Sequence, residues 1–271
     1  MKKKIIIILL LFFVVQPESV NAQPDYIYKE YYSLVGRKIK KGKSINTVKP
    51  FIGITSHHLP TAAPLLDNFY GQLKKARPDI KTFLIIGPDH FEKCKQKFVT
   101  SNKKLNTMFG ELKVDNKLYN ELIGSGIKKE GQCFIGEHSI GVQANYIKKF
   151  FPKSEVVPIL LSYSAKNKNF QNTIKVLKKR KADIFIVQST DFAHYVNAKQ
   201  ARVVDETSRK MIGELNGDSF SLKQIDSPGS IKLMLQLAKE LRLKPEIIEH
   251  KNSFDFNGAF NNTTSYFSIF F

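Results

Sequence analysis

Histidine and aspartate side chains follow three separate apolar segments of this chain. They are His57 and His58 after residues 51–54, Asp89 and His90 after residues 82–86, and Asp191 and His194 after residues 184–187. In open α/β sheets, ligands bind outside the carboxyl ends of the strands, so these distant pairs are expected to converge on one crevice. Imidazole and carboxylate groups together suit iron, zinc, copper or manganese. The spacing therefore predicts a shared metal site.

A fifth histidine, His138, follows Glu137 just before a predicted helix, in a loop position where functional groups concentrate. His90, Asp191 and His194 are also candidates for acid–base groups beside a metal-bound water. In a simpler interpretation, each histidine is a hydrogen-bonded loop residue and the aspartates only cap the helices that follow them. The repetition of the pattern at three strand ends favours the shared site.

The segments that must position these groups alternate between strands and helices. Strands are expected at residues 51–54, 82–86, 98–101, 156–161, 184–187, 246–250 and 265–270. Helices are expected at residues 62–76, 115–123, 139–150, 170–179, 198–215 and 230–241, with Asp115 and Ser139 as N-caps. This alternation predicts an α/β fold, in which a single domain over residues 50–271 has a mostly parallel central sheet flanked by helices on both faces.

The amino terminus has the pattern of an export signal. Three lysines at residues 2–4 precede an apolar run at residues 5–15, and Ala22 ends a stretch of small and polar residues. We expect a signal peptide over residues 1–22, an irregular lead-in over residues 23–49, and a secreted, periplasmic or cell-envelope location. The alternative is an uncleaved amino-terminal anchor. No other stretch of the sequence is long and apolar enough to span a membrane, so none is expected after signal cleavage.

The formal net charge of +19 raises the question of an anionic partner. The lysines are spread along the chain and lack the interleaved aromatic residues of an RNA-binding motif. This distribution favours solvated lysine faces over a nucleic-acid surface, with contact to an anionic envelope or polymer as the alternative.

Other motifs narrow the function further. The two cysteines, Cys94 and Cys133, allow one disulfide in an exported protein, but the sequence leaves open whether they meet. Neither lies in a recognisable nucleophile motif, which disfavours a catalytic thiol. The chain contains no Gly-x-Ser-x-Gly motif, phosphate-cradling loop or dinucleotide fingerprint, which disfavours serine hydrolases, nucleotide enzymes and nicotinamide enzymes.

Four short segments carry a family resemblance. They are Ser56-His57-His58-Leu59, Gly87-Pro88-Asp89-His90, Glu137-His138-Ser139-Ile140 and Ser189-Thr190-Asp191-Phe192-Ala193-His194. Together they resemble the Memo family, whose prokaryotic members are called AmmeMemoRadiSam system protein B. Residues 106–110 and 114–115 are similar to two further stretches of that family, and the order agrees from about residue 50 to the carboxyl end. The resemblance implies a fold similar to that of the class III extradiol dioxygenases.

The resemblance also implies a metal, because members of the family are associated with iron or copper held by histidines and a cysteine. His57 matches the first histidine ligand, but the Pro-His-Ala-Gly motif of the family reads Ser-His-His-Leu here, so His58 is the alternative. His90 matches the second ligand. The late cysteine of animal members is absent, and Asp255 is either an oxygen ligand in its place or a turn residue near Gly258. An oxygen ligand favours iron(II) or manganese over copper(I), so we expect iron, with copper and zinc as alternatives.

Four residues match family segments near the metal and are the candidate catalytic groups. They are His194, Asp191, His138 and Glu137. The implied function is a metal-dependent redox enzyme or oxygenase that acts on a small molecule, with His194 or His138 moving protons. One alternative is a metal-binding or interaction module without catalysis, and another is a metal-assisted hydrolase.

Overall fold

The computed structural model of this chain describes residues 44–46, 49–165, 170–256 and 258–271. The predicted signal peptide lies outside these residues, as does most of the predicted lead-in. The strands are β1 (Ile52–Thr55), β2 (Thr82–Pro88), β3 (Phe98–Thr100), β4 (Leu105–Thr107), β5 (Gly110–Leu112), β6 (Lys128–Lys129), β7 (Glu155–Leu161), β8 (Ile184–Ser189), β9 (Glu246–Asn252) and β10 (Ser265–Phe270). The helices are α2 (Ala63–Ala76), α3 (Asn116–Gly124), α4 (His138–Phe150), α5 (Phe170–Lys179), α6 (Ala198–Gly213) and α7 (Pro228–Glu240), with short 3-10 turns η1 (Gln132–Phe134), η3 (Gly217–Ser219) and η4 (Ser253–Phe256).

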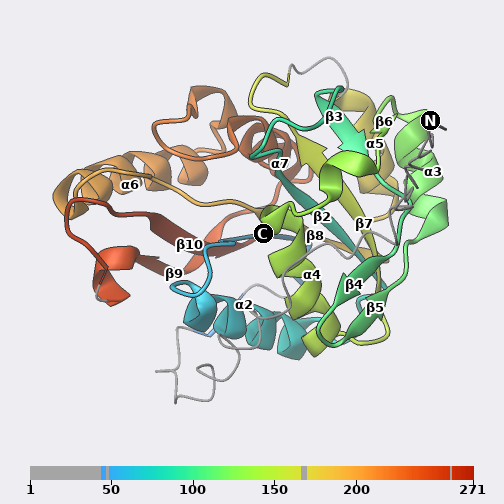
Figure 1. Cartoon of the computed structure of the whole chain (residues 1–271), viewed down its shortest axis with the longest axis horizontal. Coiled ribbons are helices and arrows are strands. Elements are labelled where there is room, and N and C mark those ends of the chain that lie inside the picture. The colour runs from blue at the N-terminus through green and yellow to red at the C-terminus, as the bar shows by residue number, and fades with distance from the viewer. Residues whose placement is uncertain (1–43, 47–48, 166–169, 257) are drawn as a thin grey trace, which may run out of the picture.

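Eight of the strands form one mixed sheet in the order β6-β3-β7-β2-β8-β1-β10-β9 (Figure 1). The four central strands, β7, β2, β8 and β1, run parallel to one another. Antiparallel pairing begins on either side of them, where β3 joins β7 and β10 joins β1. The predicted α/β class with a mostly parallel central sheet is therefore confirmed.

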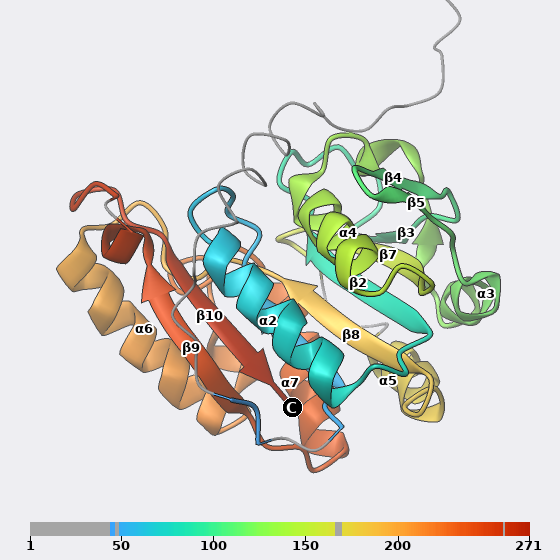
Figure 2. The same ribbon diagram turned by 90° about the horizontal axis from the view of Figure 1, so that it is seen from below.

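Both faces of the sheet are covered by helices, because the central strands are apolar on both sides. Ile85 and Val187 point into a core shared with α2 and α4, whereas Leu84 and Ile186 point into a core shared with α3, α5 and α7. Figure 2 shows α2 and α4 on one face and α5 and α7 on the other. Alternate side chains of a strand point to opposite faces, which explains why these strands read as unbroken apolar runs.

The N-cap residue predicted from the sequence is confirmed for α3 and is wrong for α4. The Asp115 side chain accepts the backbone N–H of Leu118 and caps α3, as predicted. The predicted cap of α4 was wrong by two residues, because Glu137 rather than Ser139 precedes the helix and its carboxylate accepts the Ser139 N–H. A carboxylate is a good acceptor at a helix start, and this position also directs Glu137 toward the loop after β2.

Two further features complete the frame. The β4–β5 hairpin, a separate two-stranded sheet, was not predicted, since its strands are only three residues long and mostly polar. Within the part of the chain that the structure describes, none of the helices has the length and apolar composition needed to cross a bilayer.

Candidate metal centre

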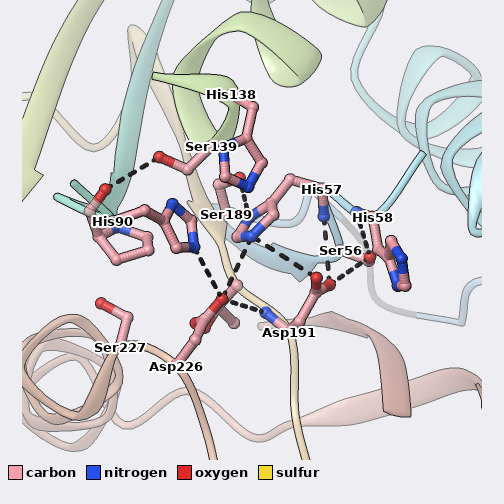
Figure 3. Close-up of polar contacts among 12 residues, drawn as sticks. Ser56, His57, His58, His90, His138, Ser139, Ser189, Asp191, Asp226 and Ser227 are labelled. Carbon is pink, nitrogen blue, oxygen red and sulfur yellow. Dashed lines mark hydrogen bonds and ion pairs between the residues drawn. The ribbon is translucent and has the colours of Figure 1, made fainter. Parts of the chain in front are cut away.

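The candidate site lies at the carboxyl ends of β1, β2 and β8. These strands are adjacent and parallel, with Thr55 beside Ser189 in the β1–β8 pair and Ile86 beside Gln188 in the β2–β8 pair. The segments that leave the three strands therefore start from one edge of the sheet. His57, His90 and Asp191 each lie two residues beyond a strand end, and Figure 3 shows them in one cluster.

His57 is buried at the centre of the cluster, and both of its ring nitrogens face polar atoms. Its Nδ1 lies 3.1 Å from the Ser189 Oγ. Its Nε2 lies 3.5 Å from Asp191 Oδ2 and 3.2 Å from Asp226 Oδ2. The Ser189 contact fixes the ring, so the Nε2 atom is held toward the two carboxylates.

His90 is held by Glu137, which comes from the start of α4. The His90 Nδ1 lies 2.8 Å from Glu137 Oε1, and the His90 backbone N–H donates to Glu137 Oε2 over 3.0 Å. Its Nε2 faces Asp226 Oδ2 at 3.6 Å. Such close approach of α4 to β2 requires a glycine at position 87, because a Cβ there would lie 2.5 Å from the Ser139 Oγ.

Asp226 is the functional candidate that the sequence pattern missed. It lies just before α7 rather than after a strand, and it is buried. Its backbone N–H donates to the Asp191 carbonyl, which brings the segment before α7 alongside the segment after β8. The Asp226 carboxylate accepts the Thr190 hydroxyl and the Asp191 N–H. The available signal was the Asp-Ser-Pro helix start, which is weak because most such aspartates only cap a helix.

Asp191 braces the segment after β1. Its Oδ1 accepts the Ser56 hydroxyl and the backbone N–H of His57, at 3.3 Å in the second case. Its Oδ2 faces His57, and the Nε2 of His194 lies 3.9 Å away from it. Asp191 and His194 therefore lie in the same cluster as His57, and Asp191 also holds the local backbone in place.

His138 lies beside His90 at the more open side of the cluster. Their rings are stacked, with centroids 4.2 Å apart and an interplanar angle of 22°. The Nδ1 of His138 is 3.5 Å from Glu137 Oε1, and 42% of its side chain is exposed. His138 is thus the imidazole of this group that solvent or a small molecule can reach most readily.

Two of the predicted metal ligands, His58 and Asp255, have other partners than the cluster around His57. The Nδ1 of His58 is 2.7 Å from the Tyr266 hydroxyl, and Figure 3 shows its ring pointing away from His57. The Asp255 carboxylate accepts the Asn252 N–H and forms an ion pair with Arg202. Among the described residues, the groups whose ligand atoms converge include neither His58 nor Asp255.

The cluster places buried carboxylates against imidazoles, and each changes the proton affinity of the other. Burial alone would lower the pKa of His57, but Asp191 and Asp226 outweigh it and raise that pKa. Burial likewise opposes the charged form of His90, yet contacts with Asp226 and Glu137 raise its pKa to about 10. Burial and the neighbouring His57 and His90 lower the pKa of His138 to about 4.

The carboxylates respond in the opposite direction. Burial would raise the pKa of Glu137, but its contacts with His90 lower it to about 2. Burial also opposes the charge of Asp226, and contacts with His57 and His90 outweigh it and hold the pKa of this carboxyl well below its usual range. The site therefore keeps negative charge buried beneath the histidines.

A disulfide supports the two segments that carry His90 and Glu137. Cys94, in the loop after β2, is joined to Cys133 in η1, with their Cα atoms 5.0 Å apart. The Asp89 carboxylate, in contrast, bonds within its own loop. It accepts the backbone N–H groups of Lys93 and Cys94. This loop-capping role is the simpler of the two interpretations of Asp89.

The cluster opens into a pocket of about 970 Å³. Its walls comprise His57, His58, Leu59, His90, His138, Tyr163, Asp191, His194, Tyr195, Leu222, Asp226, Ser253, Gly258, Ala259, Asn262 and Thr264. This volume is of the size that small-molecule ligands occupy in proteins. Burial and the nearby Asp226 raise the pKa of Tyr163 to about 12, so its hydroxyl is a proton donor in this pocket at neutral pH.

The donor set fits a transition-metal ion. The ligand atoms of His57, His90 and His138 lie within 4.8 Å of one another, and so do those of His57, Asp191 and Asp226. Both groups share His57. Imidazole and carboxylate donors at such separations, with charge already concentrated on buried carboxylates, match the ligands that iron, zinc and copper(II) accept.

Comparison with known proteins identifies the family of this chain. The family model for Memo-like proteins matches residues 22–270. The chain belongs to the Memo family. A MEMO1 family protein of Pyrobaculum aerophilum is 28% identical over 245 residues, which cover 85% of this chain and 84% of that protein. A MEMO1 family protein of Sulfurisphaera tokodaii is 26% identical, over 75% of each chain, and one of Aquifex aeolicus is 25% identical, over 69% of this chain and 74% of that protein.

The fold of this Memo family chain also has a counterpart among solved structures. The crystal structure of an uncharacterized protein from Escherichia coli matches with a TM-score of 0.50 and 11% identity, over 80% of this chain and 98% of that chain. At this identity the match concerns the fold alone. The resemblance read from the four sequence segments is confirmed at the level of the family.

Proposed function

We propose that this Memo family chain binds a divalent transition metal ion through His57 and His90 and uses it in redox or oxygenase chemistry on a small molecule. The observation that carries the proposal is the arrangement of the two rings. In each ring the Nδ1 atom is engaged, by Ser189 in one case and Glu137 in the other, while the Nε2 atom faces the interior of the cluster. Histidine ligands of metals are typically oriented by a second partner on the other ring nitrogen.

The choice of metal follows from the available donors. The sequence contains only two cysteines, and both are joined in the Cys94–Cys133 disulfide. A thiolate ligand is therefore not available while this bond is intact, and the remaining donors are imidazoles and carboxylates. These favour iron(II) over copper(I), with zinc and copper(II) as the alternatives.

The pocket residues are suited to bind a substrate and move protons. A bound iron ion would supply a Lewis acid with positions open to dioxygen or substrate. His138 has a lowered pKa and is neutral near pH 7, so its free nitrogen can accept a proton from a molecule in the pocket. The Nε2 of His194 lies 3.9 Å from Asp191 Oδ2, so this carboxylate can orient the His194 ring toward the pocket. Asp191 and Glu137 orient the histidines, and Tyr163 can donate a hydrogen bond.

The test is the metal content of the purified mature chain, measured by elemental analysis, together with uptake of iron(II) by metal-free protein under anaerobic conditions. We expect close to one ion per chain in the wild type and a strong loss in His90→Ala. Lys93→Ala is the control, because Lys93 belongs to the same loop and packs over Phe91. Full metal retention in His90→Ala, or no uptake by the wild type, would contradict metal binding at this site.

Turnover is tested separately from binding. Metal-loaded protein is incubated with small phenols, catechols and thiols while dioxygen consumption is followed with an electrode. We expect metal-dependent oxygen consumption with at least one substrate class and its loss in His138→Ala and His194→Ala, while metal content is maintained. Metal binding with no oxygen consumption would leave a binding protein, and release of phosphate or acetate from esters would instead favour the hydrolase.

We also propose that the chain is exported and that its signal peptide is cleaved after Ala22. The lysines at residues 2–4 and the apolar run at residues 5–15 support this, and a disulfide is a feature of oxidising compartments. The mass of the protein recovered from the envelope or medium of an expressing cell is expected to correspond to a chain that begins at Gln23. An intact chain in the cytosol would contradict export.

A further inference from the structure

We propose that Asp226 supplies the carboxylate ligand of the metal and completes a set of two histidines and one carboxylate with His57 and His90. This inference rests on the metal-binding function proposed above. It adds a ligand that the pattern of residues after strand ends did not predict. The ion it fits is iron(II), for which two histidines and one carboxylate with open positions are a recurrent ligand set.

The first observation is the convergence of two ring nitrogens on one oxygen atom. The Nε2 of His57 lies 3.2 Å from Asp226 Oδ2, and the Nε2 of His90 lies 3.6 Å from the same oxygen (Figure 3). Metal–ligand bonds of roughly 2.1 Å that meet near a right angle place two ligand atoms about 3.0 Å apart. The observed separations are therefore close to those of neighbouring ligands around a single ion.

The second observation is that each of the three proposed ligands is oriented by a hydrogen-bond partner outside the ligand set. Ser189 engages the far nitrogen of His57, and Glu137 engages that of His90. The Thr190 hydroxyl donates to Asp226 Oδ1, and the Asp191 N–H donates to Oδ2 over 3.1 Å. Outer partners of this kind fix ligand orientation in metal sites, and here each of the three proposed ligands has one.

The other carboxylates fit less well. The Oδ2 of Asp191 lies 3.5 Å from His57 Nε2, but its Oδ1 accepts the Ser56 hydroxyl and the His57 N–H. Asp191 therefore holds the backbone of the segment after β1 in place. Asp255 is engaged with Asn252 and Arg202. Of these acids, Asp226 is the one with an oxygen facing both His57 and His90.

His138 is disfavoured as the third ligand by its ring orientation. An imidazole donates through a lone pair that lies in the plane of its ring. Because the rings of His138 and His90 are stacked with only 22° between their planes, their lone pairs run in nearly parallel planes and do not meet at one ion. His138 is thereby left beside the ligand set as an unligated imidazole, in keeping with its proposed role in proton transfer.

The experiment uses cobalt(II) as the probe, added to the metal-free full mature chain. Asp226→Cys places a thiolate at the proposed ligand position, and a cobalt-bound thiolate gives a charge-transfer band in the near ultraviolet. We expect this band in Asp226→Cys and not in the wild type or in Asp255→Cys. Because Cys94 and Cys133 are already joined, the introduced cysteine is the one free thiol of the variant.

A second variant measures affinity. Asp226→Asn keeps the shape of the side chain but removes the charge. Its amide oxygen can still accept the Asp191 N–H, whereas its amide nitrogen must donate to the Thr190 hydroxyl instead of accepting from it. We expect it to weaken cobalt(II) binding by at least about tenfold in a competition titration, whereas Asp255→Asn changes it by less than about twofold. If Asp226→Asn does not fold, the charge-transfer band of Asp226→Cys decides the question.

The outcomes separate this inference from the proposed function. If the wild type binds cobalt(II), but Asp226→Cys gives no charge-transfer band and Asp226→Asn keeps wild-type affinity, Asp226 is not a ligand and the metal site stands without it. If the wild type takes up no metal, the proposed function fails and this inference fails with it.

Discussion

The carboxylate of Glu137 binds His90 twice, once through the ring Nδ1 at 2.8 Å and once through the backbone N–H at 3.0 Å. The same carboxylate accepts the N–H of Ser139 at the start of α4. One buried side chain thereby ties the loop after β2 to the first turn of a helix that begins nearly fifty residues later. His90 is oriented by this link before any ligand is bound.

Glu137→Gln is expected to weaken metal binding because the amide carries no charge to orient and polarise the His90 ring. Loss of such a partner typically lowers metal affinity by about 10-fold to 100-fold. Competition with a chromophoric chelator measures the change. Glu111→Gln is the control, since Glu111 forms an exposed ion pair with Lys104 on the β4–β5 hairpin. Equal affinity in both variants would show that Glu137 has only a structural role.

His57→Ala and His58→Ala are expected to behave differently. The Nε2 of His57 faces Asp191 and Asp226, whereas the Nδ1 of His58 contacts Tyr266. Removing His57 should abolish stoichiometric iron(II) uptake, while His58→Ala should retain it and change only how molecules bind in the pocket. Elemental analysis of the two variants side by side measures this. Loss of metal in His58→Ala alone would reverse the assignment.

Gly87→Ala is expected to damage both stability and the site. A Cβ at this position would lie 2.5 Å from Ser139 Oγ and 2.8 Å from Ser139 Cβ, so the start of α4 would have to move away from β2. Overpacking of this kind costs roughly 1–3 kcal/mol of unfolding free energy, and the shift would also separate Glu137 from His90. Denaturant unfolding and metal titration measure the two effects. Gly124→Ala is the control, because a Cβ there would meet nothing within 4 Å.

Removal of the disulfide is expected to destabilise the domain. The two cysteines are separated by 39 residues, and closing a loop of that length stabilises a fold by about 4 kcal/mol in the chain-entropy description. The double variant Cys94→Ser, Cys133→Ser should therefore unfold at lower denaturant concentration than the wild type. Adding a reductant to the wild type should produce the same change. Two titratable thiols in the native, unreduced protein would show that the bond is absent.

Metal affinity is expected to increase with pH. The pKa of His57 is raised by Asp191 and Asp226, and that of His90 is raised to about 10, so His90 holds a proton at neutral pH and a proton on His57 is favoured in the metal-free protein. A metal must displace these protons, and their loss becomes easier as the pH rises. Zinc(II) affinity should therefore rise between about pH 6 and about pH 8, by up to about tenfold per pH unit for each proton released. His138, with its pKa lowered to about 4, should add nothing to this slope, and a flat profile would count against ligation by His57 and His90.

The sequence by itself determined the frame of this protein and most residues of the candidate site. Unbroken apolar runs of strand length, separated by helices of apolar periodicity, specify a parallel sheet covered on both faces. That arrangement in turn brings the residues after β1, β2 and β8 to one edge. His57, His90, Asp191 and His194 were located on this ground, because each lies within a few residues of a strand end and the inference needed only local pattern.

The tertiary structure decided what depends on contacts between segments distant in sequence. Asp226 joins the cluster through a backbone pairing with Asp191, and no local pattern encodes this pairing. Ser189 holds the His57 ring and Tyr266 contacts the His58 ring, so these distant residues determine which ring faces the carboxylates. The ion pair of Asp255 with Arg202 is likewise a tertiary contact. Side-chain direction at a strand end depends on which neighbours fill the space around it. Packing supplies that information, whereas hydrophobic periodicity carries none of it.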